Sequence, residues 1–143
     1  MIGEGQLKNK LHNQIKKYNQ IEFRYYKFVE NFVNFLNQNK AHFLLNFSSQ
    51  EGMPFTIMEA MSCGIPAITS NIKPNEYLVK ENGFLFDLNN YEKSIMDTIY
   101  ELNQSLDNRK IYNLKSKKSY DYIHKYLINA NCYDQFKEIL NKL

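Results

Sequence analysis

Residues 48–70 read SSQEGMPFTIMEAMSCGIPAITS, and the proline and the glycine in this stretch set the expected fold. Pro54 suits the first turn of a helix, because the N–H that proline lacks would have no acceptor there. Gly64 is a typical residue just past a helix end, so we predict a helix between the two. Apolar runs flank this segment at residues 43–47 (FLLNF) and 65–69 (IPAIT). A strand, a helix and a second strand in this order predict a parallel sheet covered by helices.

The rest of the chain continues this alternation of short apolar runs and helical spacing. FLLNF is the best candidate for a fully buried strand, and Asn82-Gly83 favours a turn before a further strand. We expect an α/β doubly wound parallel sheet of the Rossmann-like type, with extra C-terminal helices. Because only Met1 and Ile2 precede the Gly3-Glu4-Gly5 turn, we expect the sheet to be truncated at its N-terminus. The other expected strands cover residues 21–26 and 84–86, and the other expected helices cover 6–20, 28–38, 76–79 and 90–143, the last with breaks near 107–108 and 129–131.

The composition is that of an ordinary globular domain. The 143 residues are 43% hydrophobic and 23% charged, with a net charge of +3, which does not indicate a nucleic-acid-binding protein. No apolar stretch reaches the roughly 20 residues that a membrane-spanning helix needs, and the N-terminal residues lack the apolar core of a signal peptide. Cys63 and Cys132 match no metal-ligand spacing, so we expect structural thiols, no metal and a cytoplasmic location.

Two carboxylates mark the candidate site. Glu51 follows a predicted strand and so lies at the carboxyl edge of the sheet, where open α/β folds bind ligands. Gly52 lets the backbone approach a ligand closely, and the helix near Pro54 directs free N–H groups to the same point, as phosphate binding requires. Glu59 lies about one and a half turns into that helix and can face the same crevice. From spacing alone, a helix-terminal charge at Glu51 and a solvated Glu59 remain the favoured alternative.

The whole stretch resembles a known family signature. Glu51 and Glu59 form an E-x7-E motif, and EGMPFTIMEAMSCGIPAITS is similar to the signature of family 4 glycosyltransferases, which have the two-domain GT-B fold. Ile2-Gly3-Glu4-Gly5 resembles the glycine turn of that family, and Glu76 with Asn82-Gly83-Phe84-Leu85 resembles its later segment. The resemblance runs from residue 2 to about residue 88. A dinucleotide fingerprint fits less well, because Lys8 stands at the position of its third glycine.

The resemblance implies a role for each motif residue. Glu51 would be the catalytic-site carboxylate that contacts donor-sugar hydroxyls, and Glu59 would bind the ribose hydroxyls of the nucleotide. The segment of residues 26–29 would lie beside the base, although Lys27 stands where the family often has a glycine. The other implied substrate-binding residues are Phe28 and the backbone of Gly52, Met53, Pro54, Phe55 and Thr56, which would hold the distal phosphate and the sugar.

The resemblance also implies what the whole protein does. Residues 1–143 would form the C-terminal donor-binding domain, without the N-terminal acceptor domain and the first strand-helix unit. The parent enzyme would transfer a sugar from a nucleotide diphosphate to an acceptor hydroxyl with retention, in polysaccharide or glycolipid synthesis, and would use no cofactor or metal. The basic residues that neutralise the diphosphate would lie upstream of the glycine turn, so we expect weak donor binding and little or no activity from the isolated chain.

Two other functions remain open at this stage. One is a non-catalytic nucleotide-sugar-binding fragment, and the other is a nucleotide- or phosphate-binding module without sugar chemistry. The Lys-rich residues 8–17 are expected to be solvated, and the family resemblance adds a peripheral contact with the inner face of an anionic membrane. A nucleic-acid partner is not expected.

Overall fold

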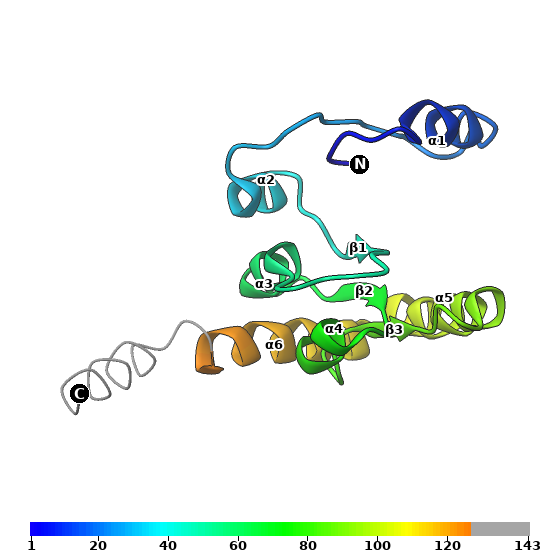
Figure 1. The fold of residues 1–143 in the computed structure, drawn as a ribbon. Helices are drawn as coiled ribbons and strands as arrows, with labels where there is room; N and C mark the ends of the chain where they lie inside the picture. The colour runs from blue at the N-terminus through cyan, green and yellow to red at the C-terminus, as the bar shows by residue number, and fades with distance from the viewer. Residues whose placement is uncertain (127–143) are drawn as a thin grey trace.

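A parallel sheet forms the centre of the computed structural model, which describes residues 1–126. Its three strands are β1 (Leu44–Asn46), β2 (Ala67–Ser70) and β3 (Phe84–Phe86), in the order β1-β2-β3. Leu44 pairs with Ala67, and Ile68 pairs with Phe84. Helices flank the sheet (Figure 1). The predicted α/β fold with a parallel, Rossmann-like sheet is therefore confirmed.

The described helices differ in how closely they lie to the sheet. In Figure 1, α1 stands away from the sheet and α2 lies beside α3, while α6 runs along the far side of α3. α5 and α6 meet at Asn108, whose extended backbone breaks the helix where the sequence predicts a break. The predicted break near 129–131 and Cys132 lie outside the described residues. The helices are α1 (Lys8–Ile15), α2 (Phe32–Gln38), α3 (Phe55–Ser62), α4 (Lys73–Leu78), α5 (Tyr91–Asp107) and α6 (Arg109–Tyr126).

The main hydrophobic core lies between α3, α6 and the sheet. Ile57 and Met61 are one helical turn apart on α3, so they point the same way and are fully buried against Ile123 of α6. Ala60, on the adjacent side of α3, packs with Leu36 of α2 in a second cluster. α3 is therefore packed on two sides.

Within residues 1–126, no helix combines the length and the apolar composition needed to cross a membrane.

β1 is shorter and more exposed than predicted. The sequence suggested a fully buried strand at residues 43–47, but Leu45 is 61% exposed and Phe47 is 52% exposed. The reason is that β1 is paired only with β2 in the described sheet, and Leu45 and Phe47 line an open cleft. The fully buried strand is β2, in which all four residues are buried.

The N-terminal strands are also reduced relative to the prediction. Instead of a strand at residues 21–26, one parallel bridge joins Ile2 to Tyr26, with the Gly3 N–H donating to the Tyr26 carbonyl at 3.0 Å. The helix predicted over residues 28–38 begins only at Phe32. The Asn31 side chain accepts a hydrogen bond from the Asn34 N–H at 2.9 Å, and this capping sets the later start. The helix predicted over 6–20 is shorter in the structure, where α1 covers only Lys8–Ile15. Helix ends commonly fray, and their bounds are the least predictable part.

The turn before β3 packs closely against β2 and α6. A methyl group on Gly83 would lie 2.5 Å from the Ala67 carbonyl oxygen and 2.6 Å from Val79 Cγ1. The Lys115 ammonium donates to the Gly83 carbonyl at 2.8 Å, and burial lowers the pKa of this lysine. The Ser119 hydroxyl donates to the Asn82 carbonyl at 2.8 Å. α6 is thereby fastened to the turn, and only glycine fits at its centre.

A buried polar cluster joins the end of β2 to α4. Thr69, Ser70 and Asn75 are all fully buried. The Asn75 Nδ2 atom donates to Thr69 Oγ1 at 2.7 Å and to the Ser70 carbonyl at 3.1 Å. Asn75 Oδ1 has no hydrogen-bond partner among the described residues. The cluster therefore depends on the amide group of one side chain as a donor.

We predict that Gly83→Ala lowers the free energy of unfolding by about 3 kcal/mol, because the methyl group collides with the Ala67 backbone carbonyl and with the fully buried Val79 side chain. Urea denaturation followed by circular dichroism measures this change. Gly5→Ala is the matched control, because a methyl group there meets nothing within 4 Å. Equal stabilities of the two variants would show that the turn is looser than described.

We predict that Asn75→Asp lowers the free energy of unfolding at pH 7.5 by about 3–5 kcal/mol, because it places an unpaired carboxylate against the Ser70 carbonyl. Burial raises the pKa of the introduced carboxyl above its unfolded value of about 3.9. Protons then bind the folded state more strongly, so stability is recovered as the pH falls towards 5 and lost as it rises. Urea denaturation at both pH values tests this, with the exposed Asn39→Asp as control; a pH-independent difference would contradict it.

Candidate functional site

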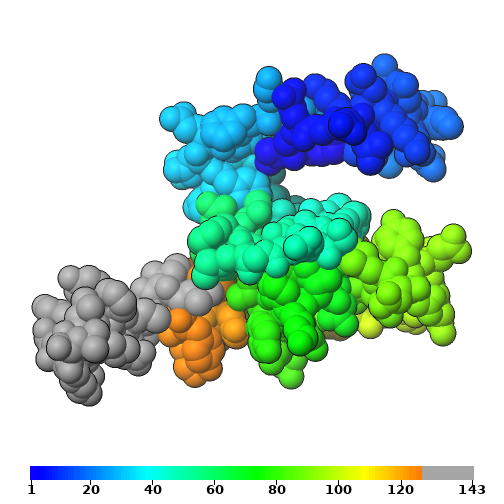
Figure 2. Space-filling model, viewed as in Figure 1, coloured from blue at the N-terminus to red at the C-terminus, as the bar shows by residue number. Residues whose placement is uncertain are grey.

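A large cleft separates the N-terminal segment from β1 and α3. Its volume is about 860 Å³, within the usual range for small-molecule sites. One wall consists of residues 1–3 and 27–29 with α2, and the other consists of β1, Ser48 and the outer face of α3. Figure 2 shows the N-terminal part set apart from the sheet by an open gap.

The polar groups of the cleft gather near the carboxyl end of β1. Thr56 and Glu59 are three residues apart on α3, so they share the face opposite to buried Ile57 and Met61. Both line the cleft, together with Ser48 of the loop after β1. The Glu59 side chain is half-buried, and no side chain among residues 1–126 pairs with its carboxylate. An unpaired carboxylate in a cleft can accept hydrogen bonds from hydroxyl groups of a ligand.

Glu51 lies in the loop between β1 and α3. It is half-buried but does not line the cleft itself. The Asn46 side-chain amide donates to Glu51 Oε1 at 3.3 Å. Asn46, the last residue of β1, does line the cleft. Glu51 is therefore attached to the cleft through Asn46.

The N-terminus of α3 offers free donors. Pro54 is the residue before the helix, one position earlier than predicted, because its carbonyl accepts the N–H groups of Ile57 and Met58. No side chain caps this end. Within residues 1–126, no acceptor is found for the backbone N–H groups of Gly52, Met53 and Thr56. Unpaired N–H groups at a helix start bind anions well.

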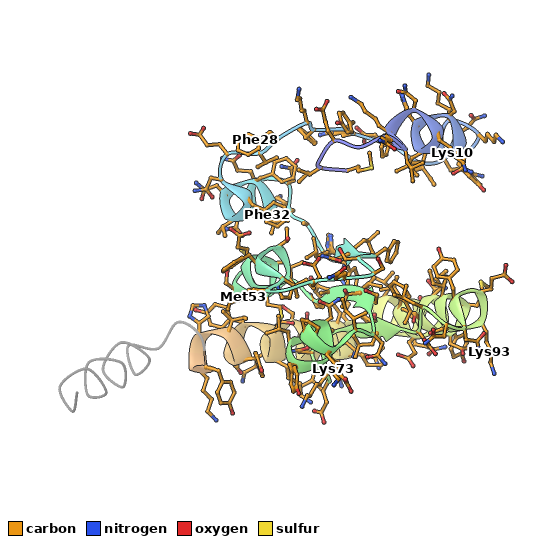
Figure 3. The ribbon with its side chains drawn as sticks, in the orientation of Figure 1. Lys10, Phe28, Phe32, Met53, Lys73 and Lys93 are labelled. Atoms are coloured by element: carbon orange, nitrogen blue, oxygen red, sulfur yellow. The ribbon has the colours of Figure 1, made fainter. Side chains whose placement is uncertain are left out.

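The segment expected beside a base forms the opposite wall. Phe28 lines the cleft with 78% of its surface exposed. Lys27 also lines the cleft, and its ammonium pairs with Glu4 at 3.2 Å. Figure 3 shows Phe28 and Phe32 on the α2 side of the cleft and Met53 beside α3.

The structure thus brings only part of the predicted site together. Lys27, Phe28, Thr56 and Glu59 line one cleft, whereas Glu51 and residues 52–55 form the adjoining loop without lining it. Sequence reasoning missed Asn46 and Ser48. The available signal was a polar residue inside the apolar run FLLNF, at the sheet edge where ligands bind. Among residues 1–126, no three His, Cys, Asp or Glu side chains gather as a metal site.

Two relatives share part of the sequence. The chain is 51% identical over 47 residues to a UDP-Gal:alpha-D-GlcNAc-diphosphoundecaprenol alpha-1,3-galactosyltransferase of Escherichia coli, which covers 32% of this chain and 12% of that protein. It is 31% identical over 130 residues to an uncharacterized glycosyltransferase of Haemophilus influenzae, which covers 83% of this chain and 33% of that protein. The chain spans at most about a third of the length of these two relatives.

A solved structure shares the fold. The crystal structure of Anabaena Alr3699/HepE in complex with UDP and glucose superposes with a TM-score of 0.74 over 99% of this chain and 40% of that one, at 18% identity. The sequence profile of the family described as glycosyl transferases group 1 matches residues 1–119. The resemblance found in the sequence is thereby confirmed, and the chain belongs to the group 1 family of glycosyl transferases.

Proposed function

We propose that this chain binds a nucleotide-diphosphate sugar in the cleft between residues 27–29 and α3. The observation that carries the proposal is that one helix, α3, carries both the unpartnered Glu59 carboxylate and, at its start, free backbone N–H groups. A nucleotide sugar needs both kinds of group, because its hydroxyls donate hydrogen bonds and its phosphates accept them. Membership of the glycosyl transferase family supports this choice of ligand.

The proposed binding mode follows the geometry of α3. Glu59, three residues after Thr56 on the same face of α3, accepts hydrogen bonds from the ribose hydroxyls. The backbone of residues 52–56 (Gly52, Met53, Pro54, Phe55 and Thr56) holds the distal phosphate, because its free N–H groups and the positive end of the helix dipole meet there. Glu51, beyond the helix start, contacts the hydroxyls of the donor sugar.

We propose uridine as the base. Phe28 presents an exposed aromatic ring at the cleft, and bases stack on such rings. Lys27 follows the same wall of the cleft. The support for uridine comes from the names of the E. coli relative, which includes UDP-Gal, and of the HepE structure, which includes UDP.

Residues 1–143 then act as the donor-binding domain of a two-domain GT-B enzyme of the hexosyltransferase type. A partner domain would bind the acceptor and close over the cleft. In the reaction, the bond between the anomeric carbon and the distal phosphate oxygen breaks, and the acceptor oxygen bonds to the same face of that carbon. UDP is the leaving group, and its phosphate oxygen takes up the proton that the acceptor hydroxyl loses. The lipid-linked acceptor named for the E. coli relative supports a place in polysaccharide or glycolipid synthesis.

We further propose a peripheral membrane contact through α1. Lys10 lies on this helix, and Lys16 and Lys17 follow its end, all exposed. Leu7 and Leu11 are exposed on the same segment. Such a mixture of cations and apolar side chains binds the surface of anionic bilayers.

We predict that UDP at millimolar concentration shifts the backbone amide signals of residues 52–59 of the ¹⁵N-labelled 143-residue chain, more than GDP or ADP does. Glu59→Gln weakens UDP binding about tenfold, because a charge-assisted hydrogen bond is lost. Glu92→Gln, an exposed carboxylate in the first turn of α5, is the matched control. Absence of shifts at residues 52–59, or equal weakening by both variants, would rule out the proposed donor site.

We predict that the chain floats with vesicles containing phosphatidylglycerol and not with pure phosphatidylcholine vesicles. The Lys10→Glu/Lys17→Glu variant weakens flotation about tenfold or more, because each lysine near an anionic surface contributes about 1 kcal/mol. Lys93→Glu on α5 is the control, away from α1 (Figure 3). Binding that does not depend on the anionic lipid would argue against the contact.

A further inference from the structure

A continuous chain of hydrogen bonds connects Glu51 to the buried interior. The Asn46 amide donates to Glu51 Oε1 at 3.3 Å, and the Ser48 N–H donates to Asn46 Oδ1 at 3.0 Å. The Ser70 hydroxyl donates to the Ser48 carbonyl, and Asn75 Nδ2 reaches Ser70 Oγ at 3.4 Å. The loop that carries Glu51 is thus tied to the polar cluster at the end of β2.

The amide orientation of Asn46 is fixed by this chain. Its Oδ1 atom must face the Ser48 N–H, which can only donate, so its Nδ2 atom faces Glu51. Asn46 ends β1, where pairing with Thr69 of fully buried β2 fixes its backbone. The amide is therefore a well-positioned donor, since the sheet holds its backbone and the Ser48 N–H sets its orientation.

The Glu51 carboxylate is consequently divided between two tasks. Oε1 accepts the Asn46 amide, while Oε2 has no partner among residues 1–126. No lysine or arginine of the described chain forms an ion pair with Glu51. A neutral donor holds the carboxylate without neutralising it, so its charge and one oxygen stay available to a ligand.

We propose that Asn46 is a positioning residue, whose amide holds Glu51 so that its second carboxylate oxygen receives donor-sugar hydroxyls. This inference rests on the proposed function, in which the cleft binds a nucleotide sugar and Glu51 contacts the sugar and not the nucleotide. Asn46 then determines how well the site distinguishes a UDP-sugar from UDP. Its effect on UDP itself is small, because the Glu59 and phosphate contacts do not pass through it.

The deciding variant is Asn46→Asp in the full 143-residue chain. It keeps an oxygen for the Ser48 N–H but replaces the donor to Glu51 with a carboxylate oxygen, which repels it. Asn39→Asp is the control, because Asn39 is an exposed residue whose amide only caps α2. Asn46→Ala is the second variant, in case the added charge reduces folding.

The first measurement needs no ligand. We expect ¹⁵N order parameters of residues 48–51 to fall from values typical of a rigid backbone towards about 0.6 in Asn46→Asp, with those of residues 52–56 unchanged. In Asn39→Asp we expect no change in either group. Adding Glu51→Gln to Asn46→Asp restores the order, because the new amide at position 51 donates to the new carboxylate at position 46. Unchanged order in Asn46→Asp and Asn46→Ala would overturn the proposal, as would failure of the rescue.

The second measurement compares dissociation constants for UDP and UDP-galactose. We expect Asn46→Asp to raise the dissociation constant of UDP-galactose about tenfold and that of UDP less than twofold. We expect Glu51→Gln to change the two constants in the same way. Equal weakening of both ligands would overturn the proposal, because Asn46 would then support the whole cleft. If the unmodified chain binds no UDP, the proposed function and the sugar role fail together, while the order parameters still decide whether Asn46 positions Glu51.

Discussion

The burial of one side of α3 is the constraint on which the rest of the structure depends. Ile57 and Met61 are fully buried against α6 and the sheet, which fixes the rotation of the helix about its axis. That rotation places Thr56 and Glu59 in the cleft, because they occupy the opposite face. The same packing fixes the direction of the free N–H groups at the start of α3. One helix therefore contributes both to the core and to the proposed ligand contacts.

Local signals made α3 and β3 predictable, whereas the N-terminal strands depended on tertiary context. Pro54 and Gly64 mark the ends of α3, and Gly64 adopts the positive φ of 69° that a helix-ending glycine allows. The Asn82-Gly83 turn likewise predicted β3 correctly. The spacing in FLLNF could not reveal that one face of β1 opens to a cleft, since that depends on how residues 1–29 lie.

The sequence indicated several residues that line the cleft but not how they are arranged. The E-x7-E spacing suggested that Glu51 and Glu59 share a crevice, yet only Glu59 lines it. The position of Glu59 follows from helical spacing, because Thr56 and Glu59 both belong to α3. Glu51 precedes the helix, so its position is set by the Asn46 contact, and a hydrogen bond between a strand end and a loop leaves no periodic trace in the sequence.

The electrostatics of the cleft favour backbone donors over side-chain cations. Lys27 is the lysine that lines the described cleft, and it pairs with Glu4 in a contact that leaves the Lys27 side chain 74% exposed and the Glu4 side chain 49% exposed. Exposed pairs of this kind contribute about 0–1 kcal/mol, so Glu4 does not hold the Lys27 side chain firmly. The N–H groups at the start of α3, in contrast, are fixed by the buried side of the helix. In the proposed site, the donors with fixed positions are therefore the N–H groups at the start of α3.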